Sequence, residues 1–194
     1  MKYIVIDTET TGLDPDQHEM IEFGAIVMIN EIITETLDIK IQPRSLDRAA
    51  PEAMKMNGYS EYRWRNALSQ EFTIKMIWQF LERHRDGITV GHNLHFDRKF
   101  IEAFGRYNNL ELKLSSPYLD TRDICRSVLA PYGLESMRLD DICEFLGWKR
   151  RKAHTALSDC EDCIRILRNM CPPKIKFIAR LELQQKIRRI RGLL

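Results

Sequence analysis

The sequence contains no run of eighteen consecutive apolar residues, and this absence excludes a transmembrane helix. Its N-terminus has no signal-peptide pattern, because Asp7 and Glu9 interrupt the apolar segment that such a peptide needs. There is no internal repeat and no low-complexity segment. The five cysteines are an odd number without the spacing of a disulfide framework, which indicates reduced thiols. We therefore expect a cytoplasmic protein with no membrane partner.

The overall composition is that of an ordinary globular domain. The 194 residues are 44% hydrophobic and 30% charged, which suits one domain with a possible appendage. The net charge of +2 conceals an asymmetry, because residues 174–194 carry seven basic residues and one acidic residue. Such a segment suits a polyanion, and it equally describes a solvated basic helix. With Pro172-Pro173 as the boundary, we predict a main domain over residues 1–172 and a basic helix or tail over residues 173–194.

The hydrophobic pattern predicts an α/β fold. Strands are expected at residues 2–7, 21–30 and 31–42, and their short connections require an antiparallel meander. Two shorter strands, at residues 88–91 and 118–121, alternate with helices and would add parallel strands to the same sheet. Helices are predicted over residues 51–56, 70–84, 97–107, 122–129, 139–146, 156–170 and 177–190. The expected architecture is a mixed sheet with the first strand central and helices on both faces.

Asp7 and Glu9 stand two residues apart at the end of the first predicted strand. Side chains alternate between the faces of a strand, so these two carboxylates project to the same side. Like charges held so close repel each other, and burial would raise their pKa values. The pair therefore indicates a place where a cation binds.

Three further residues follow predicted strands or open predicted helices. Asp97 ends the segment His92 to Asp97, His154 lies in a predicted loop, and Asp159 falls in the first turns of a helix. Taken singly, each has an ordinary interpretation, such as a helix-start charge or a surface histidine. Because active sites of open α/β sheets gather at the carboxyl ends of strands, we expect these residues to converge with Asp7 and Glu9.

Such a set of groups suits metal-assisted phosphoryl transfer. Hard carboxylate oxygens select Mg²⁺ or Mn²⁺ over zinc. Two ions about 3.5–4 Å apart can hold the attacking and leaving oxygens of an in-line displacement. A histidine beside them can accept a proton from the attacking water, because imidazole exchanges protons near neutral pH.

The order of the segments adds a family resemblance. D-x-E-T-T-G-L at residues 7–13, H-N-x-x-F-D at 92–97 and H-x-A-x-x-D at 154–159 resemble the three motifs of the DEDDh 3′–5′ exonucleases. This is the family of the proofreading subunit of bacterial DNA polymerase III and of ribonuclease T. The resemblance covers roughly residues 1–170 and fills all five family positions. It implies a ribonuclease H-like fold and an exonuclease that releases nucleoside 5′-monophosphates from a 3′ end.

The resemblance also implies roles for individual residues. Two divalent cations, Mg²⁺ or Mn²⁺, would be held by four carboxylates, with His154 as the general base. The carboxylate ligands, all of them catalytic, are Asp7, Glu9, Asp97 and Asp159. Residues implied to contact the terminal nucleotide are Thr8, Thr10, Leu13, Asn93 and Phe96.

Several alternatives remain at this point. The expected substrate is the 3′ end of single-stranded DNA, but an RNA-directed enzyme similar to oligoribonuclease or ribonuclease T is the alternative within the same chemistry. The basic segment also suits a non-catalytic nucleic-acid-binding or polymerase-associated module. The complete set of carboxylates argues against that module. A polymerase or other replication protein stays open as a partner.

Overall fold

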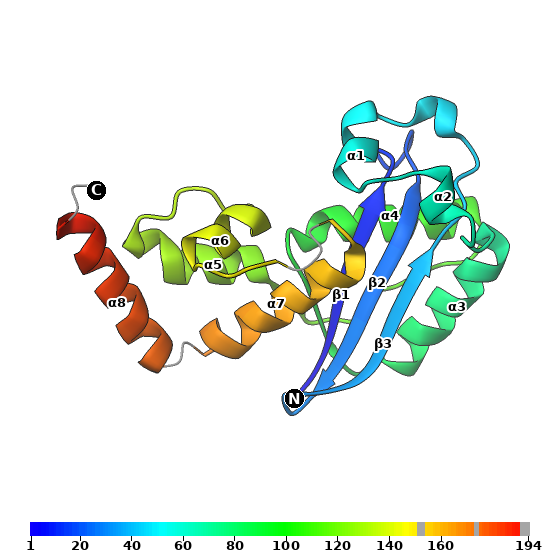
Figure 1. The fold of residues 1–194 in the computed structure, drawn as a ribbon. Coiled ribbons are helices and arrows are strands. Elements are labelled where there is room, and N and C mark those ends of the chain that lie inside the picture. The colour runs from blue at the N-terminus through cyan, green and yellow to red at the C-terminus, as the bar shows by residue number, and fades with distance from the viewer. Residues whose placement is uncertain (151–153, 173–174, 191–194) are drawn as a thin grey trace.

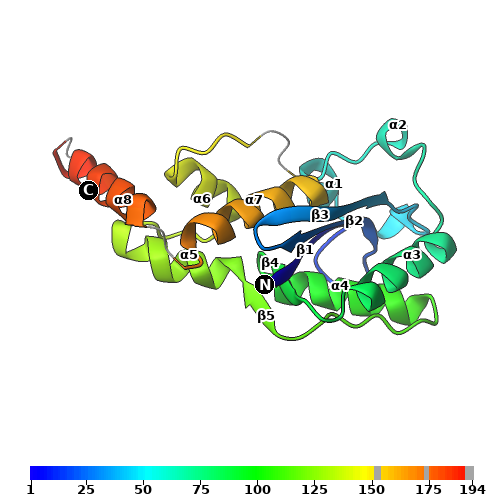
Figure 2. The ribbon, with the colours of Figure 1, turned by 90° about the horizontal axis from the view of Figure 1, so that it is seen from below.

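The computed structural model describes residues 1–150, 154–172 and 175–190 of the chain. Of the predicted basic segment, residues 173–174 and 191–194 lie outside this description. The described residues form a mixed sheet with helices on both faces, as predicted (Figures 1 and 2). None of the helices within these residues is long and apolar enough to span a lipid bilayer.

The sheet has the strand order β3-β2-β1-β4-β5, so the first strand is central as predicted. Strands β1, β2 and β3 form the antiparallel meander, while β4 pairs with β1 and β5 pairs with β4 in parallel. Strand β1 runs three residues beyond its predicted end and thereby includes both Asp7 and Glu9. The bounds are β1 Lys2–Thr10, β2 Met20–Ile29, β3 Ile32–Lys40, β4 Ile88–Gly91 and β5 Tyr118–Asp120.

The predicted helices all form, with ends that shift by a few residues. Ser69 begins one of them by accepting a hydrogen bond from the Phe72 N–H, as its capping side chain predicts. The α-helices are α1 Pro51–Met56, α2 Glu61–Trp64, α3 Gln70–Arg83, α4 Leu94–Tyr107, α5 Thr121–Leu129, α6 Leu139–Phe145, α7 Ala156–Met170 and α8 Ile175–Ile190. The short helix α2 and two 3₁₀ turns, η1 Leu46–Arg48 and η2 Ala130–Tyr132, were not predicted.

Helix α4 begins at Leu94, three residues before its predicted start. The first N–H groups of a helix have no partner within the helix and need an outside acceptor. Here the Asp120 carboxylate, at the end of β5, accepts hydrogen bonds from the N–H groups of Asn93 (3.0 Å) and Leu94 (2.9 Å). This acceptor is distant in the sequence, so the local pattern around Asp97 could not reveal it.

The alternation along β1 divides its side chains between two helical layers. Ile4 and Ile6 pack into a core with α3 and α4, whereas Val5 packs with α7 on the other face. Figure 2 shows α7 on one side of the sheet and α3 and α4 on the other. By the same alternation, Asp7 and Glu9 point to the α7 face, and Thr8 points to the α4 face.

A second core lies beside the sheet, where α5, α6, α7 and α8 meet (Figure 1). Phe177 and Leu181 of α8 are both buried in it, next to residues of η2 and α6 such as Tyr132 and Ile142. The first part of the C-terminal helix is therefore packed, and its exposed described cations include Arg180 and Lys186. The boundary after residue 172 stays a prediction.

Helix α7 lies unusually close to β2 at Gly24. A Cβ atom built on Gly24 would lie 2.5 Å from the carbonyl carbon of Ala156 and 2.7 Å from the nitrogen of Leu157. These are backbone atoms of α7, which have no flexible side chain to move aside. Gly24 is also the register partner of Asp7, so this approach brings the start of α7 next to Asp7.

We expect Gly24→Ala to destabilise the protein by about 1–3 kcal/mol, because the added methyl group forces α7 away from the sheet. In a domain of this size, each 1 kcal/mol corresponds to roughly 2–4 °C in melting temperature, which thermal unfolding can measure. Gly87→Ala is the matched control, since its Cβ would mainly meet the end of the Ile4 side chain. Equal losses in the two variants would contradict the close packing of α7 on Gly24.

Candidate active site

Three carboxylates meet at the end of β1. Asp7 and Glu9 come from β1, and Asp159 comes from the first turns of α7. One oxygen of each lies within 4.8 Å of the others, which is close enough for the three to share one metal ion. Oxygen ligands from carboxylates are the chemistry that divalent cations such as Mg²⁺, Mn²⁺ and Ca²⁺ prefer. The donor set therefore fits a divalent cation, and the predicted convergence of these three residues is observed.

Asp97 reaches the same place from the opposite face of the sheet. Its Oδ1 accepts hydrogen bonds from the backbone N–H of Thr8 (2.9 Å) and from the Thr8 hydroxyl (2.8 Å). The Asp97 side chain is buried, and its charge is near enough to raise the pKa of Asp7. Asp97 thus lies beside the three-carboxylate cluster and is fixed to the strand that carries two of its members.

Desolvation raises the pKa values of all four carboxyl groups, and the charges of neighbouring carboxylates raise them further. Desolvation raises the pKa of Asp7 well above its ordinary value, and the charges of Asp97, Asp159 and Glu9 raise it further. Desolvation, followed by the charge of Asp159, raises the pKa of Glu9 to about 8. Desolvation also raises the pKa of Asp97 to about 7, against the lowering effect of the Thr8 hydrogen bonds. Holding all four groups ionised together therefore costs free energy unless a positive charge lies beside them.

Arg150 supplies part of the missing positive charge. Its buried guanidinium pairs with Asp159, with Asp140, and through Nε with Asp162 at 2.7 Å. Desolvation raises the pKa of Asp159 to about 7, although the Arg150 charge lowers it. We did not identify Arg150 from the sequence, because it belongs to a basic run in which no residue is distinguished from its neighbours.

Glu22 holds the start of α7 against the sheet. Its Oε1 accepts a hydrogen bond from the Ala156 N–H at 3.0 Å, and its Oε2 pairs with the Lys40 ammonium group. Glu22 is the register partner of Glu9 and is only 1% exposed. Sequence reasoning missed this residue, yet a charged side chain inside the apolar run of β2 was the signal that could have found it.

His154 lies at the edge of the cluster. Its backbone N–H donates to the Asp159 carboxylate, and its φ of 62° places it in the left-handed region. The imidazole Nε2 lies 3.6 Å from an Asp140 oxygen, and the ring lines the same cavity as Asp140 and Asp159. The predicted base is therefore next to the carboxylates. The residues just before it, 151–153, lie outside the described part of the chain.

The five residues predicted to contact substrate fall into two groups. The hydroxyl groups of Thr8 and Thr10 are bonded within the protein, to Asp97 and to the Gly12 carbonyl, and both side chains are buried. In the structure these two hydroxyl groups therefore bind other parts of the protein. The other three are more accessible. Leu13 is 81% exposed, Asn93 is exposed and left-handed, and Phe96 is half-buried against Phe100.

A cavity of about 560 Å³ opens next to the carboxylates. Asp159, Asp140 and His154 lie on its wall, and Asn93, one of the predicted substrate residues, lies on it as well. Small-molecule and cofactor sites commonly have volumes of 300–1,000 Å³. The cavity is therefore large enough to admit part of a substrate to the cluster.

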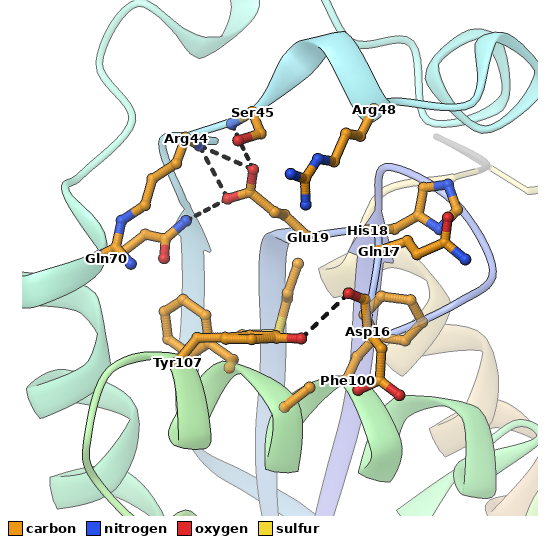
Figure 3. Close-up of a pocket in the computed structure, with 13 residues that line it drawn as sticks. Asp16, Gln17, His18, Glu19, Arg44, Ser45, Arg48, Gln70, Phe100 and Tyr107 are labelled. Atoms are coloured by element: carbon orange, nitrogen blue, oxygen red, sulfur yellow. Dashed lines mark hydrogen bonds between the residues drawn. The ribbon is translucent and has the colours of Figure 1, made fainter.

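A separate cavity of about 220 Å³ lies between α4 and the loops at residues 16–20 and 44–48 (Figure 3). The Glu19 carboxylate in it accepts hydrogen bonds from the backbone N–H groups of Arg44 and Ser45 and from the Gln70 amide. None of the ten sequence-predicted site residues lines this cavity. Its carboxylate is already satisfied, so the arrangement that suits a cation is the one at the end of β1.

A family model described as "Exonuclease" (RNase_T) matches residues 4–167 of the chain. The chain is 34% identical over 158 residues to DNA polymerase III PolC-type from Thermotoga maritima, covering 81% of the chain and 11% of that relative. It is 31% identical over 160 residues to DNA polymerase III subunit epsilon from Aquifex aeolicus, covering 81% of the chain and 74% of the relative. The chain thus spans about a ninth of the PolC-type relatives.

Solved structures share the fold. The complex of E. coli exonuclease I with a dT13 oligonucleotide has a TM-score of 0.74 and 18% identity, and the match covers 86% of this chain and 40% of the other. The zinc-bound form of the E. coli exonuclease I complex with single-stranded DNA has a TM-score of 0.77 and 18% identity, covering 100% and 45%. These matches support the predicted ribonuclease H-like architecture.

We expect the metal-free protein to lose stability as the pH rises from about 6 to 8.5. An acidic group with a raised folded-state pKa stabilises the folded state below its unfolded pKa, and that contribution disappears as the pH passes the folded pKa, here about 7 to 8. One pKa unit corresponds to about 1.4 kcal/mol. Melting temperatures in a chelator across this range would measure the loss.

Added Mg²⁺ should therefore raise the melting temperature more at about pH 8.5 than at about pH 6, because cation binding displaces protons. Asp7→Asn removes one of the repelling charges. It should raise the metal-free melting temperature at high pH and reduce the effect of Mg²⁺. A Mg²⁺ effect that is the same at both pH values would contradict this electrostatic account.

Proposed function

The chain belongs to the exonuclease (RNase T) family, and from this membership we propose that it is a metal-dependent 3′–5′ exonuclease. The reaction is hydrolysis of the terminal phosphodiester at a 3′ end, with release of a nucleoside 5′-monophosphate. Hydrolysis needs an activated water and a means to stabilise charge on the phosphate and on the leaving oxygen. The candidate site is arranged for both requirements.

The observation that carries this proposal is the cluster of Asp7, Glu9 and Asp159, with one oxygen of each within 4.8 Å of the others. Partly buried like charges at this distance destabilise a fold unless something compensates for them. Arg150 compensates on one side only, at Asp159. The side that faces Asp7 and Glu9 is suited to cations.

Asp7, Glu9 and Asp159 would hold one divalent cation, and Asp97 together with Asp7 would hold a second. Mg²⁺ or Mn²⁺ fits these oxygen ligands, and such ions stabilise the charge of an in-line phosphoryl displacement when they are bound. Thr8 fixes Asp97 through two hydrogen bonds, which leaves the second Asp97 oxygen for this role. Arg150 holds the Oδ1 atom of Asp159 and thereby orients its other oxygen.

His154 is the proposed general base. Its backbone is bonded to Asp159, so the imidazole ring is attached directly beside the cluster. Asp140 lies 3.6 Å from Nε2 and would orient the ring at the cavity wall, where the imidazole would accept a proton from the attacking water.

Single-stranded DNA is the substrate that we favour. The relatives include polymerase III proteins, and the structural neighbours include complexes with DNA oligonucleotides. Leu13 offers an exposed apolar side chain to a base, and Phe96 offers an aromatic ring, which together suit stacking without sequence readout. An RNA substrate is the second candidate, because no described residue identifies a 2′-hydroxyl reader.

A catalytic role is better supported than a purely binding one. A non-catalytic module has no use for four carboxylates gathered at one place, and their repulsion would only lower its stability. The names of the relatives make a DNA polymerase the partner class that we propose. A cytoplasmic location, predicted from the free cysteines, stays a prediction.

The decisive experiment follows the length of a 5′-labelled oligonucleotide in the presence of Mg²⁺. We expect a ladder of products shortened from the 3′ end, and we expect Asp7→Asn to lower the rate by about 10³-fold or more. Loss of several kcal/mol of charge stabilisation corresponds to this factor. Asp86→Asn is the matched control, because Asp86 is an exposed carboxylate paired only with Lys2.

Parallel reactions on single-stranded DNA, duplex DNA and short RNA would rank the substrates. Failure of the wild-type protein to shorten any of the three in Mg²⁺ or Mn²⁺ would reject the exonuclease. Shortening that persists undiminished in Asp7→Asn would reject the site.

We expect His154→Ala to lose about 10²–10⁴-fold in turnover while it keeps oligonucleotide binding, because only proton transfer is removed. Added imidazole should restore part of the activity, since the truncation leaves space for a small base at the cavity wall. His95→Ala, at an exposed position of α4, serves as the control. Unchanged turnover in His154→Ala, or loss of oligonucleotide binding, would remove His154 from this role.

A further inference from the structure

The cavity beside the carboxylates is lined by charged residues of both signs. Its acidic residues are Glu135, Asp140 and Asp159, and its basic residues include Arg122 and Arg138. Arg150 also lines the cavity, but three carboxylates already occupy its guanidinium group. The two remaining arginines therefore supply positive charge in the cavity that the catalytic site does not use.

Arg122 is held in place by a network at the start of α5. The Asp120 carboxylate accepts the backbone N–H of Arg122 at 2.9 Å, in addition to those of Asn93 and Leu94. The Arg122 Nη1 atom donates to Asn93 Oδ1 at 3.0 Å. Arg122 and Asn93 are thus fixed to each other and to the ends of β4 and β5. A charged group that is positioned in this way needs little rearrangement to bind a ligand.

The Arg122 guanidinium has no anionic partner in the part of the chain that the structure describes. No described carboxylate lies within ion-pair distance of it, and its Nε atom is buried without a hydrogen-bond acceptor. Arg138 is exposed and likewise forms no ion pair with a described residue. A buried guanidinium nitrogen without an acceptor is uncommon, because its desolvation is not repaid. The Arg122 side chain also lines the cavity, so an anionic ligand bound there could supply the partner that the guanidinium lacks.

Phosphate is the anion that matches these donors. The planar guanidinium group can bind two phosphate oxygens at once. Because Asn93 Oδ1 is occupied by Arg122, its amide NH₂ group remains as a further donor on the cavity wall. One fixed arginine, one amide and a second, exposed arginine form a set of hydrogen-bond donors that suits a phosphodiester.

We propose that Arg122, with Asn93 and Arg138, binds the second phosphate of the nucleic-acid strand, counted from the 3′ end. This inference rests on the proposed exonuclease function. The scissile phosphate has to lie at Asp7, Glu9 and Asp159, whereas Arg122 comes from the start of α5. Arg122 and Asp159 line the same cavity of about 560 Å³, which has room for a nucleotide. Arg122 is thus a residue that positions the strand and makes the enzyme sensitive to its length.

The first test compares substrates that differ only in the second phosphate. The dinucleotide dTpdT has the scissile phosphate alone, whereas the trinucleotide dTpdTpdT adds the next one. We expect the wild-type protein to favour the trinucleotide by about tenfold in kcat/KM, which is the effect of one charge-assisted contact. A trinucleotide with an uncharged methylphosphonate at the second linkage should be hydrolysed as slowly as the dinucleotide.

The second test removes the arginine. Arg122→Gln should lose about tenfold more on the trinucleotide than on the dinucleotide, and it should lose all discrimination against the methylphosphonate. A melting temperature close to that of the wild-type protein would show that the variant is folded. Arg126→Gln is the matched control, because Arg126 lies one turn further along α5, is exposed and pairs with Asp123. It should behave as the wild-type protein does.

Three results would overturn the inference while the exonuclease stands. These are equal rates on the charged and methylphosphonate trinucleotides, an equal loss by Arg122→Gln on dinucleotide and trinucleotide, and discrimination that survives in Arg122→Gln. The second of these would instead place Arg122 at the scissile phosphate or at the product phosphate.

Binding of the same trinucleotides in Ca²⁺ separates the proposed phosphate site from the proposed exonuclease function. Selective binding without hydrolysis in Mg²⁺ would reject the exonuclease and retain the phosphate site.

Discussion

The electrostatic repulsion between four carboxylates at the end of β1 is the constraint that the surrounding residues have to satisfy. Asp7, Glu9 and Asp159 bring oxygens within 4.8 Å of one another, and Asp97 lies beside them. Desolvation is the largest cause of their raised pKa values, and for Asp7 the charges of the other three raise the pKa further. A protein of this size has only about 5–15 kcal/mol of net stability. The surrounding residues must therefore offset much of this repulsion before any cation binds.

The two faces of the sheet share this task in different ways. On the α7 face, Gly24 lets the helix approach the strand, and Glu22 accepts the first N–H of that helix. Arg150 then neutralises Asp159 from outside the cluster. On the α4 face, Thr8 fixes Asp97 with two hydrogen bonds. The alternation of β1 makes this division necessary, because Thr8 points away from Asp7 and Glu9.

The sequence predicted the parts of the fold that depend on local chemistry. The ranges 51–56, 88–91 and 156–170 have the predicted bounds, because proline, glycine and hydrophobic periodicity act within a few residues. The start of α4 was wrong because its N–H acceptor is Asp120, on another strand. Arg150 was missed for the same reason. Its role depends on three carboxylates that only the folded chain brings together.

The charges around the cavity would orient a bound nucleic-acid strand. A polyanion is repelled by a cluster of carboxylates unless cations stand between them, so the scissile phosphate alone gains little from this end of the cavity without metal. A phosphate at Arg122 is attracted with or without metal, and its binding energy can be used to hold the scissile bond in the correct position. The nucleic-acid strand then extends from the carboxylates, where its terminal phosphodiester is hydrolysed, to Arg122, which holds its next phosphate. Asn93 links these two places. It precedes the first residue of α4, the helix that contains Asp97, and its side chain accepts a hydrogen bond from Arg122.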